Sequence, residues 1–498
     1  MGSGKMRITN FFKRALPVVL AASLLGGCSL GAKKDPLKEL GEESSASIKM
    51  MYYDERSFYS QYGMVFSSLF PEIEFEVATT GNLYQEGKDY DESVYEFIEE
   101  ENPDILMLSE GQYRKLAAEG KLYSIESVME SDGFDTEGII PGIIEYIREL
   151  GDGTLYGLSP SFNAQALFYN KKLFDKYQIT YPEDRMTWDE VLQLAARFPT
   201  DGSGEDRVFG LKAGYDTSLF GLATAIGTSE GLSIINADKR QVTINSDAWR
   251  RVFETSLNAI KSNAIYSQEN DMMGGSFDYM SYLKQDALIG GKAAMVIEHS
   301  YMLNQLREAK NSLKEDELPD WDVVTAPIDP KNPDSSVYTS VGQVFAINAQ
   351  SPNLRAAWKF LKYIHSDEYS RVSSKAQTFG GLPIRTEYLE DNEGRNMAAF
   401  YSLKPADNNF YKDYGKIPNS FFMEYQQLAE TELKKVVDDG ASLNDTLDSL
   451  QEKLQEALTL AFQNADKDKE ASGEDVSAAP PVEVQETVEG STEETAAE

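Results

Sequence analysis

The stretch IKMMYYDERSFYSQYGMVFSSLFPEIEFEV, residues 48–77, determines the expected fold. Its first part, 48–53, is a largely apolar run that predicts a strand. The alternation of Ile73, Phe75 and Val77 with polar residues predicts a second, half-buried strand. Between the two strands a helix is expected, because apolar residues recur there at helical spacing, namely at Phe58, Tyr62, Val65, Phe66 and Leu69.

The following segments continue this alternation. A helical pattern surrounds Phe97, an apolar run at 105–108 predicts a buried strand, and 112–119 predicts a helix that ends at a glycine. The order β-α-β-α-β-α predicts a parallel sheet with helices on its faces. Ligands of such sheets bind at the carboxyl ends of the strands. The loops at 53–56 and 109–111 are therefore candidate site segments.

Composition and charge restrict the function. The 498 residues include 47 Lys and Arg against 82 Asp and Glu, which gives a net charge of −35. An acidic surface repels nucleic acids, so nucleic-acid binding is disfavoured. The single cysteine, Cys28, excludes an intramolecular disulfide framework and an all-cysteine zinc site. We expect neither a cofactor nor a bound metal.

The N-terminal 27 residues have the layout of a signal peptide. Basic residues up to Arg14 precede an apolar run at 15–25, which is too short to span a bilayer comfortably. The run LGGC at 25–28 resembles a bacterial lipobox, in which cleavage leaves an N-terminal cysteine that carries diacylglycerol. We expect a signal peptide at 1–27, a palmitoylated Cys28 as membrane anchor, and a flexible tether at 28–47. An ordinary secretory signal and an uncleaved anchor are the alternatives.

The C-terminal segment, residues 464–498, is strongly acidic. It contains 11 acidic residues, two lysines and no aromatic residue. Such a composition cannot bury enough apolar surface to offset chain entropy, so we predict a disordered tail. Immediately before it, one apolar helix face is predicted from Leu443, Leu447, Leu450, Leu454 and Leu458.

Several segments, in order, resemble the extracellular solute-binding proteins of ABC sugar importers, the class that includes maltose-binding protein. They are GTLYGLSP at 153–160, ALFYNKKLFDKY at 166–177, TWDEV at 187–191, GKAAMVI at 291–297, AINAQSPNLRAAWKFLKYIHSDE at 346–368 and GGLPIR at 380–385.

The resemblance implies a two-lobe, periplasmic-binding-protein-like α/β fold. Each lobe would be a largely parallel sheet flanked by helices, with the ligand cleft between the lobes. Lobe one would comprise 48–165 plus 295–347, and lobe two 166–294 plus 348–463. Ligand binding would close the lobes by a hinge motion.

Carried over position by position, the resemblance also implies ligand-binding residues. Sugar sites combine aromatic faces with polar groups that bond the hydroxyls. Tyr301 stands where the family often has Trp. A structural role is the simpler explanation for any one aromatic side chain, since the chain has 27 Tyr and 24 Phe, and Glu55 could simply pair with Arg56. The candidates are Tyr53, Glu55, Arg56, Ser109, Glu110, Asn163, His299, Tyr301, Gln343 and Phe379.

Other motifs carry less weight. GTSEG at 227–231 fits G-x-S-x-G but lacks the expected strand before and helix after the serine. The acid-rich run 201–206 does not follow the twelve-residue calcium-loop pattern, and calcium binding there stays open. The four tryptophans are predicted to be packing residues.

Together these observations predict a binding protein and not an enzyme. It would be lipid-anchored on the extracytoplasmic face of a bacterial cell membrane, monomeric, and would capture a carbohydrate, expected to be an oligosaccharide. It would deliver this ligand to permease subunits driven by a separate ATPase, since the chain has no Walker A motif. A surface-anchored glycoside hydrolase or esterase is the alternative, and a receptor for a sensor kinase is a third possibility.

Overall fold

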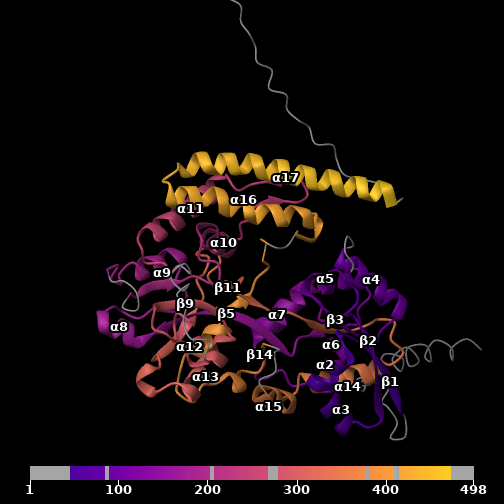
Figure 1. The fold of residues 1–498 in the computed structure, drawn as a ribbon. Coiled ribbons are helices and arrows are strands. Elements are labelled where there is room, and N and C mark those ends of the chain that lie inside the picture. The colour runs from indigo at the N-terminus through magenta and orange to yellow at the C-terminus, as the bar shows by residue number, and fades with distance from the viewer. Residues whose placement is uncertain are drawn as a thin grey trace, which may run out of the picture. The chain divides into compact units, whose positions relative to one another are not determined.

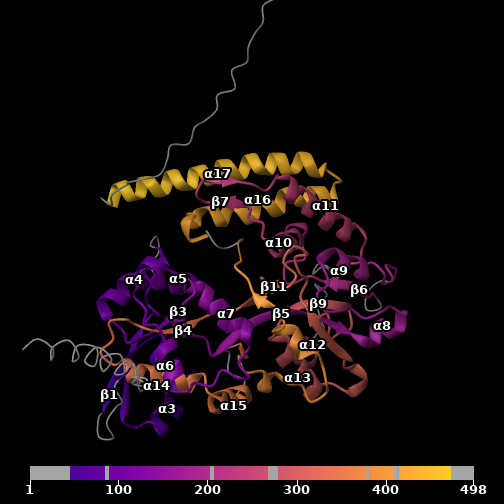
Figure 2. The same cartoon turned by 180° about the vertical axis from the view of Figure 1, so that it is seen from behind.

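The structure is a computed structural model that describes residue 37 and residues 45–84, 89–201, 207–266, 279–376, 381–408, 410 and 414–472. The described residues fall into two compact units, Met1–Gly214 with Asn263–Asp407 and Tyr215–Ser262 with Asn408–Glu498. The chain therefore contributes to each unit twice (Figures 1 and 2). These boundaries differ from those of the predicted lobes, 48–165 plus 295–347 and 166–294 plus 348–463, which stay a prediction.

The first unit contains a five-stranded sheet in the order β2-β1-β3-β13-β4. β1, β2 and β3 are the three strands predicted from the sequence, and they run parallel to one another. β13 is antiparallel to both β3 and β4. The strands are β1 Ala46–Tyr52, β2 Ile73–Thr79, β3 Ile105–Leu108, β4 Gly157–Leu158 and β13 Val344–Ile347.

The helices predicted between these strands are also present. They are α2 Glu55–Phe58, the π-helix η1 Tyr59–Gly63, α3 Met64–Leu69, α4 Tyr90–Glu101 and α5 Glu110–Ala118. Phe58, Phe66 and Phe75 pack against Phe360 of α14, Leu354–Ile364, with ring centroids 5.2 to 5.9 Å from that of Phe360. The periodicity in residues 48–77 therefore marks side chains of the core.

A second sheet in the same unit has the order β10-β5-β9-β6. β5 is antiparallel to β9 and β10, whereas β6 is parallel to β9. The short strands β12 and β14 also pair with β5. The strands are β5 Ser161–Asn170, β6 Phe209–Lys212, β9 Ala293–His299, β10 Trp321–Thr325, β12 Thr339–Ser340 and β14 Leu382–Pro383.

Two sheets flanked by helices confirm the predicted α/β class, but the expectation of largely parallel sheets was wrong. Both sheets are mixed, because β13, β4, β5 and β10 run antiparallel to a neighbour. The prediction extended the direction of the first three strands to the whole fold. Local alternation of apolar residues predicts a strand but not its direction, which depends on partners far away in the chain.

β5 connects the two sheets and positions part of the site. Only two residues, 159 and 160, separate it from β4, which belongs to the first sheet. In the register of its first residues, Phe162 faces Leu382 of β14 and Asn163 faces Ser340 of β12. Asn163 is therefore held by strands on both sides of β5.

The remaining elements of the first unit complete its layers. Thr187 caps α9, with its side chain accepting from the Glu190 N–H. These elements are α6 Glu126–Ser131, α7 Pro141–Leu150, α8 Lys171–Tyr177, α9 Trp188–Ala195, α12 Tyr279–Gln285, α13 Met302–Ser312, η4 Glu315–Glu317, β11 Ser335–Ser336, α15 Asp367–Ala376, η5 Thr386–Leu389, η6 Met397–Phe400 and β15 Lys404–Pro405.

The second unit is mainly helical. Its elements are α10 Leu219–Ser229, β7 Ile235–Asn236, β8 Gln241–Val242, α11 Asp247–Lys261, η7 Tyr414–Lys416, α16 Asn419–Asp438 and α17 Leu443–Ser472. The leucine face predicted for α17 is confirmed, since Leu447, Leu450, Leu454 and Leu458 are fully buried. Gln451 and Gln455 of the same helix bond the backbone of β8.

The predicted start of the disordered tail at residue 464 was wrong, because α17 continues to Ser472. Extending an existing helix adds one hydrogen bond per residue and needs no new nucleus, so polar residues can follow. Arg240 stabilises this extension, since its guanidinium lies over the Phe462 ring and 3.3 Å from the Asp466 carboxylate. Residues 473–498 lie outside the described part of the chain.

One residue of the predicted tether belongs to the core. Leu37 is only 6% exposed and packs in the core of the first unit. Its carbonyl oxygen accepts a hydrogen bond of 2.7 Å from Arg355 Nη2 on α14. The prediction of a uniformly flexible segment over 28–47 was therefore wrong at Leu37. Removing the apolar leucine side chain from water is favourable, and this holds the residue in the core. Cys28 and the signal region lie outside the described residues.

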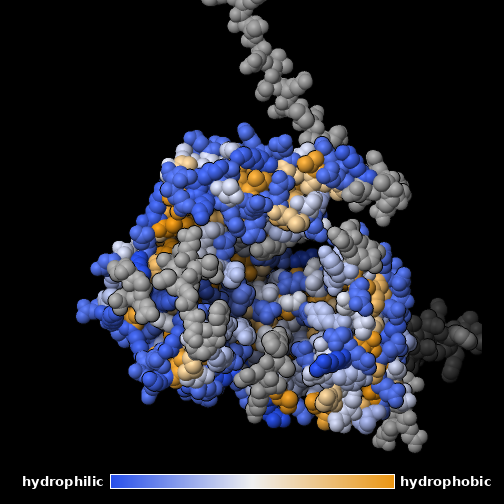
Figure 3. Space-filling model, in the orientation of Figure 1, coloured by the Kyte–Doolittle hydropathy of each residue, from blue (hydrophilic) through white to orange (hydrophobic). Residues whose placement is uncertain are grey.

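The described surface is polar. The face in Figure 3 is mainly hydrophilic, with hydrophobic patches that are small and separate. Within the part of the chain that the structure describes, none of the helices combines the length and the hydrophobicity needed to cross a bilayer.

Candidate ligand-binding site

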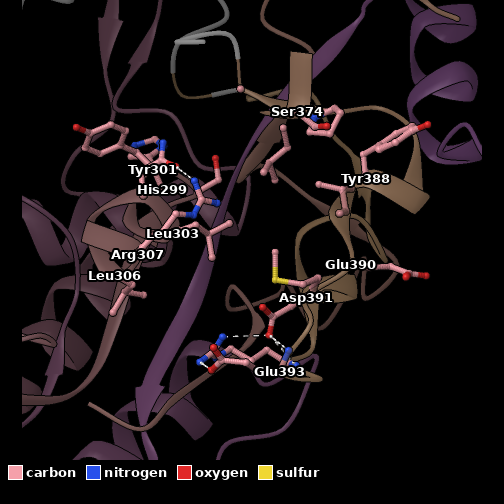
Figure 4. A pocket seen from close by; sticks show the side chains of 18 of the residues that line it. His299, Tyr301, Leu303, Leu306, Arg307, Ser374, Tyr388, Glu390, Asp391 and Glu393 are labelled. Carbon is pink, nitrogen blue, oxygen red and sulfur yellow. Dashed lines mark hydrogen bonds and ion pairs between the residues drawn. The ribbon is translucent and has the colours of Figure 1, made fainter. Parts of the chain in front are cut away.

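A cavity of about 840 Å³ lies in the first unit. Its walls come from the start of β5, the end of β9 with α13, the segment from β14 to residue 397, and parts of η1 and α15. Figure 4 shows His299, Tyr301 and Arg307 on one wall, with Tyr388 and Ser374 across from them. The volume falls within the range of about 300–1,000 Å³ that is usual for small-molecule sites.

Asn163 lines this cavity and is held in a narrow space. Gly342 and Gly381 both have positive φ angles, of 65° and 85°. A Cβ atom on Gly342 would lie 3.0 Å from Asn163 Nδ2, and one on Gly381 would lie 2.9 Å from Asn163 Oδ1. A larger residue at either position would press against the Asn163 side-chain amide and would also have to adopt a positive φ angle, which glycine adopts without strain.

His299 and Tyr301 line the cavity where β9 ends and α13 begins. Gln165 Nε2 lies 3.2 Å from His299 Nε2. An amide nitrogen can only donate, so in this arrangement the imidazole accepts at Nε2 and carries its proton at Nδ1. Tyr301 is 58% exposed, which leaves its ring open to stacking.

Six other predicted residues lie at one edge of the first sheet but do not line the cavity. β1 and β3 are parallel, and Val344 at the start of β13 pairs with Leu108 at the end of β3. The segments that follow β1 and β3 and the one that precedes β13 therefore meet at this edge. The six residues are Tyr53, Glu55, Arg56, Ser109, Glu110 and Gln343.

Two of these six have structural partners. Ser109 caps α5, and its hydroxyl oxygen accepts from the Gln112 N–H. Glu110 accepts hydrogen bonds from the Tyr146 hydroxyl at 2.7 Å and from the Val341 N–H at 3.0 Å. Burial raises the pKa of the Glu110 carboxyl, despite these bonds. We infer that Glu110 positions the turn before Gln343.

Three predicted features lie outside the described residues. These are Phe379, the lipidation site Cys28, and residues 202–206 of the acid-rich run. Gly381, two residues after Phe379, does line the cavity.

Charged residues form the wall away from His299. Lys310 of α13 pairs with Glu393, and Arg395 pairs with Asp391 at 3.1 Å. The Arg395 guanidinium also lies 4.0 Å from the Trp321 ring centroid. All four tryptophans are at most 9% exposed, as expected for packing residues.

Comparison with known proteins adds the family. The sequence profile of the bacterial extracellular solute-binding proteins matches residues 71–370, which is more than half of the chain. The chain belongs to this family.

Individual relatives are distant. A binding protein of Brucella abortus (strain 2308) is 27% identical over 260 residues, covering 51% of this chain and 57% of the relative, so the match spans little more than half of that protein. The sugar-binding protein MalE from Xanthomonas citri has a TM-score of 0.54 at 16% identity, with 84% of this chain and 98% of that one covered. An ABC substrate-binding protein from Listeria monocytogenes, in complex with cycloalternan, has a TM-score of 0.51 at 18% identity, with 84% and 100% covered. Both structures share the fold.

As a member of the bacterial extracellular solute-binding proteins, the chain is a binding protein and not an enzyme. The residues that could have indicated catalysis have structural surroundings. Ser229 of the G-x-S-x-G match lies in the last turn of α10, and its hydroxyl donates to the Ile226 carbonyl. His365 is fully buried, and burial lowers its pKa to about 4.

Several cavity residues of the solute-binding protein could not be predicted from the sequence. Gln61 accepts from the Tyr52 hydroxyl at 2.8 Å and donates to the Tyr62 hydroxyl at 3.1 Å. Tyr62 stacks on Tyr369 of α15, and burial raises the pKa of both phenols. Helical spacing predicts only that Tyr62 lies on the apolar face of a helix, and nothing in the local pattern links it to Tyr369, which lies 307 positions later in the chain.

Proposed function

We propose that this solute-binding protein captures a carbohydrate, an oligosaccharide, and delivers it to an ABC importer. The observation that carries the proposal is the wall formed by Asn163, His299 and Tyr301. It offers an amide, an imidazole and an open aromatic ring to one cavity. Aromatic faces that stack on sugar rings, together with a few oriented polar groups that bond hydroxyls, suit this ligand class.

The related structures support the same ligand class. One of them is described as sugar-binding and another holds cycloalternan. Membership of the extracellular solute-binding family supports delivery to permease subunits in the membrane, with ATP hydrolysis by a separate subunit.

The residues at the edge of the first sheet would complete the site. We propose that Tyr53, Glu55, Arg56 and Gln343 contact the ligand after a hinge closure of the two predicted lobes. A ligand that touches both lobes favours the closed state by its extra contacts there. The hypothesis that Phe379 adds a second ring belongs to the same proposal.

A lipid on Cys28 would hold the protein at the extracytoplasmic face of the membrane. Two or more acyl chains make such anchoring stable. The test is mass spectrometry of the N-terminal peptide from the membrane-extracted protein. A lipid-modified cysteine is expected, and the Cys28→Ser chain should be released from the membrane. An unmodified N-terminal cysteine in the mature chain would overturn this part of the proposal.

Calorimetric titration tests the ligand class. The mature protein is titrated with a panel of mono- and oligosaccharides, and separately with amino acids, peptides and glycerol phosphates. We expect binding to at least one sugar and no comparable binding in the other groups. Tight binding of another solute class, with no sugar bound, would contradict the proposal.

A further inference from the structure

Arg307 differs from Lys310 and Arg395, which also line the cavity and pair with carboxylates. It is exposed on α13, and its Nη1 donates a 3.2 Å hydrogen bond to the Asn304 side-chain oxygen. Among the described residues, no carboxylate lies within ion-pair distance of its guanidinium. Its charge is therefore held in place by a neutral amide and is not neutralised.

Two of the other cations of the cavity wall, Lys310 and Arg395, have carboxylate partners, whereas Lys172 has a neutral one. Lys172 donates to the Leu318 carbonyl at 2.7 Å, and Lys310 pairs with Glu393. Arg395 pairs with both Asp391 and Glu393. Of the two arginines in the described part of the cavity wall, Arg307 is thus the one that can add a charged partner without breaking an existing ion pair.

The position of Arg307 suits a ligand held at Tyr301. Tyr301, Asn304 and Arg307 follow one another at intervals of three residues along the start of α13. Three residues correspond to about 4.5 Å along a helix axis, close to the width of one sugar ring. Asn304, one helical turn after Tyr301, holds the Arg307 guanidinium. A substituent of a sugar that stacks on the Tyr301 ring can therefore reach this guanidinium. Figure 4 shows the Arg307 side chain extending along the wall that also carries His299 and Tyr301.

The donors left on Arg307 favour an anion with two oxygens. A guanidinium has five N–H groups, and the bond to Asn304 uses one of them. The remaining donors can form the two parallel hydrogen bonds that bind carboxylate or phosphate. Glu390, an acidic residue of the opposite wall, is directed away from Arg307 in Figure 4.

We propose that the carbohydrate ligand carries an anionic group, a carboxylate or a phosphate, and that Arg307 binds it. This inference rests on the proposed carbohydrate function and narrows its ligand class to acidic sugars. The net charge of −35 repels anions at long range, so the selectivity must come from a short-range contact such as this one.

Matched ligands test the proposal. Oligogalacturonates of two to four units are compared with their methyl esters, which have the same rings without the charge, and glucose 6-phosphate is compared with glucose. The four proteins are wild type, Arg307→Gln, Arg307→Lys and the control Lys261→Gln, which removes an exposed cation of α11 that does not line the cavity. Titration calorimetry measures Kd, and circular dichroism checks folding.

We expect wild type to bind a charged member at least about tenfold more tightly than its neutral partner. Arg307→Gln should abolish this preference, Arg307→Lys should keep part of it, and Lys261→Gln should leave it unchanged. The uronate and phosphate pairs distinguish the two sources of the anion. Equal affinity for charged and neutral members, or a preference unchanged in Arg307→Gln, would overturn the inference while leaving the carbohydrate function intact. If no sugar of either kind binds while another solute does, the proposed function itself fails.

Discussion

Two arginines of the same unit, Arg355 and Arg307, have opposite surroundings. Arg355 is 9% exposed, donates to both oxygens of Asp132 at 2.8 and 3.0 Å, and donates to the Leu37 carbonyl. Arg307 is exposed, lines the cavity and has one neutral partner. The first side chain joins α14, α6 and the N-terminal segment, whereas the second is available to a ligand. The contrast separates a charge that supports the fold from a charge suited to binding.

The largest expected effect is on the buried pair. Asp132→Ala leaves the buried Arg355 guanidinium without its carboxylate, and removes the partner of the Trp358 indole N–H. Breaking one side of a fully buried ion pair costs about 3–5 kcal/mol, and the lower end of that range applies here because the Asp132 side chain is 17% exposed. Chemical denaturation should therefore show a loss of about that size. A loss below about 1 kcal/mol would mean that this cluster does not support the fold as described.

On the binding side of the comparison, Tyr301→Ala should weaken carbohydrate binding by about 1–3 kcal/mol, because it removes a stacking ring. Its stability should change little, since the side chain is 58% exposed. Tyr215→Ala is the matched control, with an 86% exposed ring that does not line the cavity. Equal affinities of the two variants, measured by titration, would remove Tyr301 from the site.

Acid should reduce the contribution of the Asp132 cluster. Burial raises the Asp132 pKa, but hydrogen bonds from Arg355 and Trp358 and the positive charge of Arg355 outweigh this, so the pKa lies below its ordinary value. A lowered folded-state pKa adds stability above the unfolded-state pKa of about 3.9, and this stability is lost as the pH falls through the folded-state value. The stability difference between wild type and Asp132→Asn should therefore shrink below about pH 4. A difference that is constant from pH 7 to pH 2.5 would contradict the charge-based explanation.

The smallest expected effect is that of Arg307→Gln on folding. An exposed side chain with one neutral partner should change the free energy of unfolding by no more than about 0.5 kcal/mol. Thermal or urea unfolding measures this change. A much larger loss would show that Arg307 supports the fold and would remove the contrast with Arg355.

Local patterns predicted much of the fold. The strands and helices of residues 48–118 and the leucine face of α17 follow from the spacing of apolar side chains that form the core. Strand direction did not follow, because β13 and β5 pair with strands far away in the chain. Leu37 was missed for the same reason, since its burial depends on α14, more than 300 residues later.

The candidate site was predicted in part. Asn163, His299 and Tyr301 line one cavity because they lie beside the quoted motifs, at the start of β5 and at the junction of β9 with α13. Arg307 gave no signal, since an arginine on the polar face of an amphipathic helix usually contacts solvent. Arg307 lines the cavity without a carboxylate partner. This property depends on how segments distant in sequence are arranged in the folded chain.

The most direct test of the account is mass spectrometry of the ligand that co-purifies with the full mature chain. The protein is isolated from its native host without added sugars and denatured, and the released small molecules are identified. The account predicts a carbohydrate in near-stoichiometric amount, bearing a carboxylate or phosphate, and its absence or strong depletion from Tyr301→Ala prepared in the same way. Recovery of an amino acid, a peptide or a lipid instead, in equal amounts from both proteins, would contradict it.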